Sequence, residues 1–239
     1  MCCMKKNIFN SSNTHILKYN YKNYINKPIL YAPKSIEKIY EINVIKKLLK
    51  FNCSKHTFVD VGAHIGFYSI LYSYFFKKVY AFEPSIFQSQ YLNHNKKINR
   101  IKNLKIFNSG LGDKNIKKKL FVMGRSGGNN TFINDNIRNF NPMFSYEVKL
   151  NKLDQFELEN LSLIKIDVEG FELQVILGAL RIIKRCKPII IVEISNQNTS
   201  KKLIQILKKI GYNIYYPYKN AQELAFCFCE EDKINVKFL

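Results

Sequence analysis

Short apolar stretches alternate with amphipathic stretches along the chain from residue 57 onward. The apolar stretches have the length and the Val, Ile and Phe content of strands, and they cover residues 57–61, 79–82, 104–108, 163–167 and 188–193. Helical patterns or helix-start signals follow at residues 66–76, 85–99, 171–184 and 200–210. Strands that are apolar throughout and alternate with helices are typical of a parallel sheet covered on both faces. The pattern therefore predicts a three-layer α/β sandwich.

The last two predicted strands differ from the others in their connection. Residues 212–216 and 224–228 are separated by only seven residues, which leaves no room for a helix. A parallel crossover needs a dozen or more residues, whereas antiparallel neighbours can be joined by a short loop. We therefore expect a mostly parallel seven-stranded sheet that ends in an antiparallel hairpin.

The beginning of the chain does not follow this alternation. It is rich in Asn, Lys and Tyr and weakly patterned as far as residue 34. In residues 35–50, apolar positions recur at helical spacing and Ser35 can cap the start, which predicts a lead-in helix. We interpret residues 1–45 as a polar extension with part of this helix, and residues 46–239 as the folded domain.

A long excursion, residues 113–150, separates the third and fourth predicted strands. It contains one predicted strand at 119–123 and a Gly-Gly-Asn-Asn-Thr loop at 127–131, and a short helix is predicted after it at 153–160. Excursions of this kind often carry binding groups, and Asn and Thr are suited to hydrogen bonding with sugar hydroxyls. A plain surface turn explains the loop equally well.

The net charge of +20, from 38 basic and 18 acidic residues, suggests an anionic partner such as a nucleic acid. Two observations weaken this interpretation. Only five basic residues are arginine, the side chain that phosphate and base readers favour. The lysines are spread along the chain with abundant Asn and Ile, and A/T-rich codons would produce the same composition.

The six cysteines form no Cys-x-x-Cys pair and no Cys/His cluster with zinc spacing, so we expect reduced, mostly buried thiols and no zinc site. A divalent metal at Asp167, Glu169 and Glu172 would lower the pKa of a hydroxyl, but no histidine lies near them in sequence, so we assign no metal ligands. The longest apolar stretch is far shorter than the ~20 residues of a membrane helix. The first residues lack the apolar core of a secretion signal. These features together lead us to expect a cytoplasmic protein without a membrane span.

The first predicted strand runs into Asp60, Gly62 and Gly66, a glycine turn that leads to a helix. Gly62 allows the backbone to turn and to approach a ligand closely. His64 occupies the middle glycine position of the dinucleotide pattern G-x-G-x-x-G, and no phosphate-binding Gly-Lys-Ser/Thr follows. The acidic residue before the turn favours a positively charged ligand over a pyrophosphate.

Glu83 ends the next predicted strand, 21 residues after Gly62, and Pro84 stops that strand from continuing. A carboxylate at this spacing typically accepts hydrogen bonds from ribose hydroxyls. The glycine turn and Glu83 together predict a nucleoside-containing ligand more strongly than either does alone.

Three acids, Asp167, Glu169 and Glu172, crowd the end of the fourth predicted strand and the start of the next helix. Doubly wound folds bind ligands at the carboxyl ends of such strands. A helix N-terminus tolerates acids without any further role, but three beside a glycine turn favour a functional site. Glu193 closes the following strand in the same way.

The motifs DVGAHIG, AFEP, NSGLGDK, IKIDVEGFE and KPIIIVEIS occur in this order between residues 57 and 195. In this arrangement the chain resembles the FkbM-type family of S-adenosylmethionine-dependent methyltransferases. The resemblance implies a class I methyltransferase-like (Rossmann-like) fold and O-methylation, commonly of a sugar or polyketide hydroxyl. The family usually has Asn where this chain has His64, so the role of that position stays open.

The resemblance places around the cofactor the residues Asp60, Gly62, Ala63, His64, Gly66, Glu83, Pro84, Ser109, Asp113 and Asp167. It implies that Asp60 and the two glycines line the methionine and sulfonium part, while Glu83 holds the ribose. Asp113 or Ser109 would contact the adenine edge. Methylation of a hydroxyl needs a base, for which the candidates are Asp167, Glu169, Glu172 and His64; strand-end geometry favours Glu169 or Asp167.

Other activities fit parts of the sequence. The positive charge supports a methyltransferase acting on RNA ribose or cap, which a Lys-Asp-Lys-Glu tetrad would identify. Lys165 and Asp167 share a face of one strand, but no second well-placed lysine is evident. An inactive binding module conflicts with the intact Asp60, Gly62 and Glu83. The missing middle glycine disfavours an NAD-dependent oxidoreductase.

Overall fold

The computed structural model describes residues 14–18, 29–33, 56–123, 129–133, 142–194, 198–216 and 224–229. The lead-in helix predicted over residues 35–50 lies outside these ranges, as do Gly127 and Gly128 of the predicted loop. Among the described residues, no helix combines the length and the apolar composition that crossing a membrane requires.

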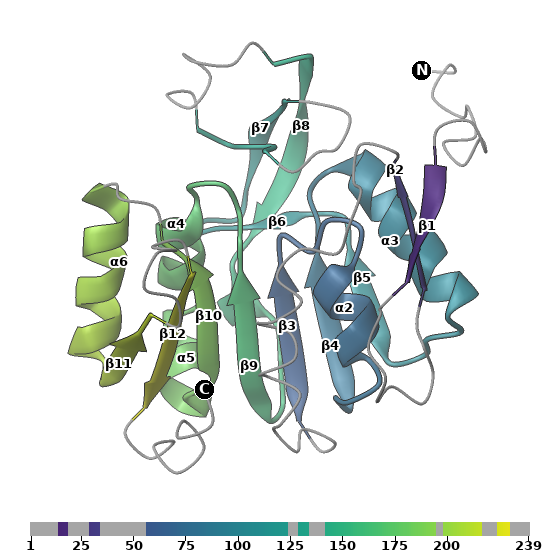
Figure 1. Ribbon diagram of the computed structural model, residues 1–239. Coiled ribbons are helices and arrows are strands. Elements are labelled where there is room, and N and C mark those ends of the chain that lie inside the picture. The colour runs from purple at the N-terminus through teal and green to yellow at the C-terminus, as the bar shows by residue number, and fades with distance from the viewer. Residues whose placement is uncertain are drawn as a thin grey trace.

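A seven-stranded sheet forms the centre of the molecule (Figure 1). In spatial order its strands are β11 (Tyr212–Tyr215), β12 (Leu224–Cys229), β10 (Ile189–Glu193), β9 (Leu161–Ile166), β3 (Thr57–Val61), β4 (Lys78–Phe82) and β5 (Leu104–Phe107). The five strands from β10 to β5 are parallel, and β12 is antiparallel to both β10 and β11. The predicted parallel sheet with an antiparallel terminal hairpin is confirmed.

Each face of the sheet packs against its own set of helices. Phe58, Val79 and Ala81 share one buried cluster with α2 (Phe67–Tyr72) and α3 (Ile86–Ile98). Val59 and Ile164 belong to a second cluster, with α4 (Glu172–Leu177), α5 (Leu180–Cys186) and α6 (Asn198–Lys209). Because neighbouring strand residues point to opposite faces, a strand buried on both faces must be apolar throughout, as the sequence pattern showed.

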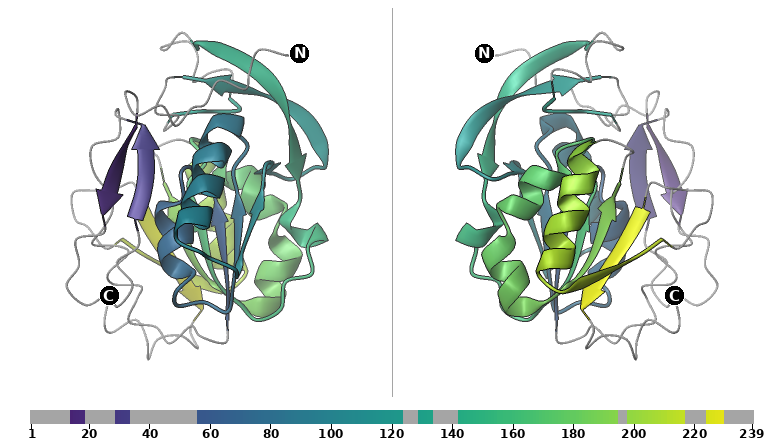
Figure 2. Two further views of the ribbon diagram at one scale, coloured as in Figure 1. Left: turned by 90° about the vertical axis from the view of Figure 1, so that its right-hand side faces the viewer. Right: turned by 90° about the vertical axis from the view of Figure 1, so that its left-hand side faces the viewer.

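A second, three-stranded sheet lies beyond the carboxyl ends of the parallel strands (Figures 1 and 2). It consists of β6 (Gly110–Leu111), β7 (Ile116–Val122) and β8 (Phe144–Asn151), with β8 in the middle. β7 covers most of the strand predicted at 119–123, but β8 was not predicted. In β8 only Val148 and Leu150 are buried, so the alternation of buried and exposed positions that marks a strand is short.

The beginning of the chain contributes two strands that were not predicted. β1 (Thr14–Lys18) and β2 (Ile29–Pro33) form an antiparallel pair, and β2 packs against α3. Leu30 and Ala32 are fully buried in the same cluster as α2 and α3. Part of the predicted polar extension therefore adds to the core.

The predictions for three helices need correction. The helix predicted over 171–184 breaks into α4 and α5 at Gly178, where a Cβ atom would lie 1.9 Å from the backbone oxygen of Gly112. The helix predicted over 153–160 is only a 3₁₀ turn, Leu153–Gln155. The helix predicted over 66–76 is regular only in α2, after which Tyr74 and Phe75 bond to carbonyls three residues back.

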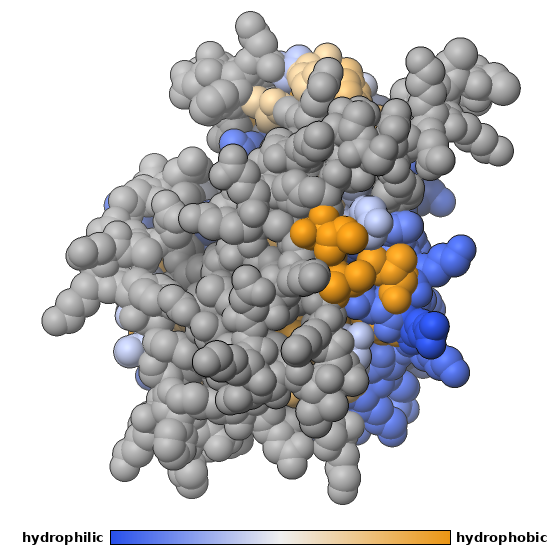
Figure 3. Space-filling model, turned by 45° about the vertical axis from the view of Figure 1, so that its right-hand side comes forward, coloured by the Kyte–Doolittle hydropathy of each residue, from blue (hydrophilic) through white to orange (hydrophobic). Residues whose placement is uncertain are grey.

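Exposed lysines lie on several elements, among them Lys97 of α3, Lys117 and Lys119 of β7, and Lys201 and Lys208 of α6. On the face shown in Figure 3, the described surface is mainly hydrophilic, with small apolar areas. Because these lysines do not follow one stripe, the net charge alone points to no particular anionic partner.

Candidate functional site

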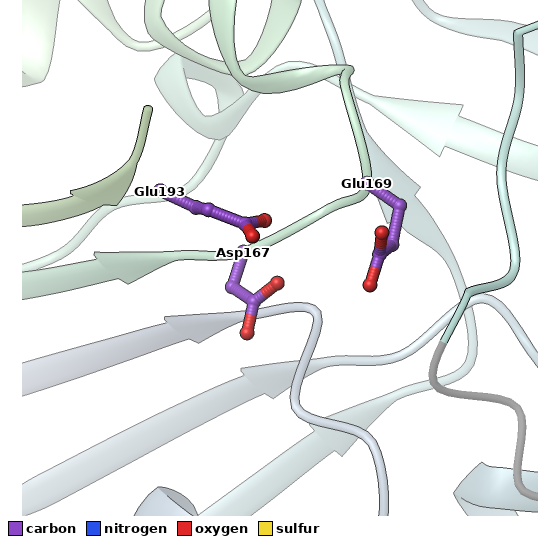
Figure 4. A group of neighbouring side chains, drawn as sticks. All are labelled: Asp167, Glu169 and Glu193. Carbon is purple, nitrogen blue, oxygen red and sulfur yellow. The ribbon is translucent and has the colours of Figure 1, made fainter. Parts of the chain in front are cut away.

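Three acids come together where β9 and β10 end. Asp167 follows β9, Glu193 is the last residue of β10, and Glu169 lies in the loop before α4. One carboxylate oxygen of each lies within 4.8 Å of the others. In Figure 4, Glu193 and Glu169 lie on opposite sides of the Asp167 carboxylate. This trio, which we call the acid cluster, offers the kind of ligands that bind cations.

A buried lysine compensates part of this negative charge. Lys165, only 5% exposed, places Nζ 2.8 Å from Oδ2 of Asp167 and 4.9 Å from the centre of the Tyr68 ring. Burial alone would raise the pKa of Asp167, but the charge and hydrogen bond of Lys165, together with Glu193 and His64, hold this pKa below its usual value. Asp167 is therefore ionised at neutral pH. The sequence offered one sign of this ion pair, a lysine between two isoleucines of an apolar strand, but pairing with Asp167 was not predicted.

The other two members of the acid cluster hold protons more tightly. Burial, and then the charge of Asp167, raises the pKa of Glu193 to about 9 and that of Glu169 to about 8. Protonated Glu193 can donate a hydrogen bond to Asp167. The cluster thus combines one carboxylate with two carboxylic acids at neutral pH. Glu193 was recognised at the strand end but was not among the predicted site residues.

The loop that carries Glu169 is held by Glu172 and Thr131. Glu172 Oε1 accepts hydrogen bonds from the N–H groups of Val168 (3.2 Å) and Gly170 (3.0 Å). Thr131, from the predicted Gly-Gly-Asn-Asn-Thr loop, donates to the carbonyl of Glu169 (3.0 Å). Glu169 has a φ of 53°, a left-handed conformation that is strained for a residue with a side chain. The contacts thus fix Glu169 in an unfavourable backbone conformation.

The glycine turn lies against this loop. A Cβ atom on Gly62 would come within 1.9 Å of the carbonyl oxygen of Asp167, and Gly62 has a φ of 78°. Asp60, at 1% exposure, accepts a hydrogen bond from Ser69 through Oδ2. Its Oδ1 is buried without a hydrogen-bond partner among the described residues. Burial raises the pKa of Asp60 despite the nearby Lys165, so a cationic ligand group here would satisfy an unpaired oxygen.

Glu83 connects the glycine turn to the end of β4. Its Oε2 accepts from the N–H of His64 and its Oε1 from the N–H of Ser85, both at 2.8 Å. Burial raises the pKa of Glu83 to about 7. Each oxygen still has a second lone pair to accept from a hydroxyl. The backbone of Ala63 is fixed by its hydrogen bond to the carbonyl of Phe82 (3.1 Å).

Ser109 and Asp113, the two residues predicted to contact the adenine, lie in different parts of the structure. Ser109 accepts a hydrogen bond from Asn151 (3.1 Å), but the adjacent Asn108 donates to the carbonyl of Glu83 (3.0 Å), so Ser109 lies near the end of β4. Asp113 follows β6, and its Cα lies 3.3 Å from the position of a Cβ on Gly178. Asp113 is thus packed at the junction of α4 and α5.

A protein-family model described as the methyltransferase FkbM domain matches residues 60–214. This range includes the glycine turn, Glu83 and the acid cluster, and it agrees with the resemblance found in the motifs. No curated protein matches the chain.

Three solved structures share the fold. An FkbM methyltransferase from Methylobacillus flagellatus KT is 19% identical with a TM-score of 0.53; the alignment covers 80% of this chain and 46% of that one. An rRNA methylase from Streptococcus thermophilus is 12% identical with a TM-score of 0.51, covering 80% and 96%. A precorrin-6y C5,15-methyltransferase from Geobacter metallireducens GS-15 is 13% identical with a TM-score of 0.50, covering 83% and 94%. The chain thus spans about half of the Methylobacillus protein.

Proposed function

Because the chain belongs to the FkbM family of S-adenosylmethionine-dependent methyltransferases, we propose that it transfers a methyl group to a hydroxyl of a sugar or glycan. The observation that carries the proposal is the acid cluster, which lies beside the glycine turn at one edge of the sheet. A cofactor turn and a group of proton acceptors are the two parts that methylation of a hydroxyl requires.

The residues of the glycine turn fit the cofactor. Oδ1 of Asp60, buried and unpartnered among the described residues, would accept a hydrogen bond from the methionine end. The Glu83 carboxylate would accept from the ribose hydroxyls, and the backbone N–H of His64 holds it in place. Ala63 and Gly66 lie in the turn between β3 and α2, and Pro84 lies just after β4. We place Ser109 toward the adenine and leave Asp113 out.

We assign Glu169 as the base. When bound, the cofactor would supply an electrophilic methyl group, and the Glu169 carboxylate would take the proton of the acceptor hydroxyl. A pKa of about 8 lies close to an ordinary working pH, where a general base is most effective. Asp167 is the weaker base because Lys165 lowers its pKa. Glu172 positions the loop through its backbone contacts.

The segment next to Glu169 supports a hydroxyl-rich acceptor. Asn130 accepts from the N–H of Met123 through Oδ1 (3.2 Å), while its Nδ2 is buried without a hydrogen-bond partner among the described residues. The neighbouring Thr131 is bonded to the backbone of Glu169. A sugar hydroxyl that reached this buried amide donor would satisfy it.

One observation favours RNA ribose as a second candidate. Lys165, Asp167 and Glu193 lie together, and they match three of the four residues of a Lys-Asp-Lys-Glu tetrad. Within the described ranges, Lys165 is the lysine whose charge acts on Asp167. The net charge of +20 would assist RNA binding.

The test supplies S-adenosylmethionine with an isotopically labelled methyl group to two sets of acceptors, free sugars and glycans on one side and RNA on the other. We expect label on an oxygen of a sugar or glycan. Label on RNA ribose alone would replace the proposal by the second candidate. Label on nitrogen or carbon in every product would contradict hydroxyl methylation.

A further inference from the structure

Two asparagines, Asn95 of α3 and Asn99 at the C-cap of α3, bond to the backbone edge of β2 that faces away from β1. Asn95 accepts from the N–H of Tyr31 (2.6 Å) and donates to its carbonyl (3.0 Å). One helical turn later, Asn99 accepts from the N–H of Ile29 (3.0 Å) and donates to its carbonyl (2.7 Å). The opposite edge of β2 pairs with β1.

The spacing of the two asparagines along the helix fits the spacing of the backbone groups along the strand. Helix positions four apart are separated by about 6 Å along the axis, and alternate residues of a strand are separated by about 6.8 Å. Two side-chain amides on one helix face can therefore bond to alternate backbone groups of a strand, as a neighbouring strand would. The N-terminal strand pair, β1 with β2, is thus docked on α3 by specific hydrogen bonds as well as by Leu30 and Ala32.

Asn95 also reaches the glycine turn. Its Nδ2 donates to the carbonyl of Ile65 at 2.8 Å, and the side chain is fully buried. Ile65 lies between His64 and Gly66, two residues with φ of 53° and 98°. Asn99, at the C-cap of α3, instead gives its third hydrogen bond to the carbonyl of Asn95 (2.8 Å). One amide thus bonds both to the docked strand and to the turn proposed to hold the cofactor.

We propose that Asn95 is a positioning residue that couples docking of the N-terminal strand pair to the conformation of residues 62–66. Cofactor binding and strand docking then strengthen each other, since coupling between two sites is reciprocal. This inference rests on the proposed cofactor site. It gives the beginning of the chain a role in cofactor affinity although β1 and β2 lie outside the matched methyltransferase domain.

The test compares full-length wild type, Asn95→Ala and Asn99→Ala. The two variants each lose three hydrogen bonds, but only Asn95→Ala loses the one to Ile65. Calorimetric titration with S-adenosylhomocysteine should show a Kd raised about fivefold or more in Asn95→Ala and less than about twofold in Asn99→Ala. In hydrogen exchange, this ligand should protect the Tyr31 amide in wild type and not in Asn95→Ala.

Equal Kd values for the two variants, or a Tyr31 amide that exchanges at one rate with and without ligand in wild type, would overturn the coupling. If Asn95→Ala does not fold, Tyr31→Pro decides, because it removes the strand-side donor to Asn95 without touching Ile65. The Kd of Tyr31→Pro should rise about fivefold or more, and an unchanged Kd would overturn the inference. A wild-type protein that binds no S-adenosylhomocysteine would overturn the proposed function, and this coupling with it.

Discussion

Replacing Glu169 by Gln is expected to lower the rate of methyl transfer by about 10²- to 10⁴-fold, the usual contribution of a general base. The amide keeps nearly the same shape but cannot take the hydroxyl proton. The hydrogen bond from Thr131 goes to the backbone of Glu169, so the variant keeps it. Single-turnover rates measured with a labelled methyl group check this expectation, and the Kd for S-adenosylhomocysteine should stay within about twofold of wild type because Glu169 is not assigned to the cofactor.

The pH dependence of the methyl-transfer rate tests the role of Glu169 independently. Since burial, and then Asp167, raises the pKa of Glu169 to about 8, its carboxylate form increases as the pH rises through that value. The wild-type rate should therefore rise between pH 6 and 9, and the residual rate of Glu169→Gln should lose this step. Glu157→Gln, at an exposed position, is the matched control. A Glu169→Gln enzyme with the wild-type rate and profile would move the base to Asp167.

Gly62→Ala is expected to destabilise the protein by about 2–5 kcal/mol, from left-handed strain and overpacking together. The new Cβ would lie 1.9 Å from the carbonyl oxygen of Asp167, a backbone atom that cannot yield without moving the end of β9. Because the same turn is proposed to hold the cofactor, affinity for S-adenosylhomocysteine should also be lost. Urea unfolding and titration measure the two effects.

Gly211→Ala separates strain from the steric clash. Gly211 has a φ of 90°, comparable to that of Gly62, but among the described residues, apart from its chain neighbours, no atom lies within 4 Å of its Cβ position. Only the conformational cost of about 1–2 kcal/mol should remain, with unchanged cofactor affinity. If both variants lost a similar free energy of unfolding, the contact between the glycine turn and Asp167 would not be the reason that position 62 requires glycine.

The sheet and the location of the site could be predicted because local pattern carries that information. A buried parallel strand must be apolar on both faces, so strands such as Ile189–Glu193 stand out in the sequence. Parallel strands place their carboxyl ends at one edge, so Asp60, Glu83 and Asp167 could be grouped from the sequence alone. The seven-residue connection was enough to predict the terminal hairpin.

The elements that were missed depend on contacts distant in sequence. β2 is stabilised by Asn95 and Asn99, more than 60 residues away, so its own pattern is weak. The break between α4 and α5 follows from the backbone of Gly112 against Gly178. Sequence proximity also could not separate the roles of Glu169 and Glu172, because only the structure shows Glu172 bonded to backbone N–H groups of the loop.

The most direct test of the account is thermal unfolding of wild type and Glu83→Gln with S-adenosylmethionine, S-adenosylhomocysteine or NAD. At about 100 times the Kd, a ligand of the folded state adds about 2.7 kcal/mol to the free energy of unfolding. We predict this stabilisation for wild type with the two sulfur compounds, little with NAD, and a clear loss in Glu83→Gln. Stabilisation by NAD alone, or equal stabilisation of Glu83→Gln, would contradict the cofactor site built from Asp60, Gly62 and Glu83.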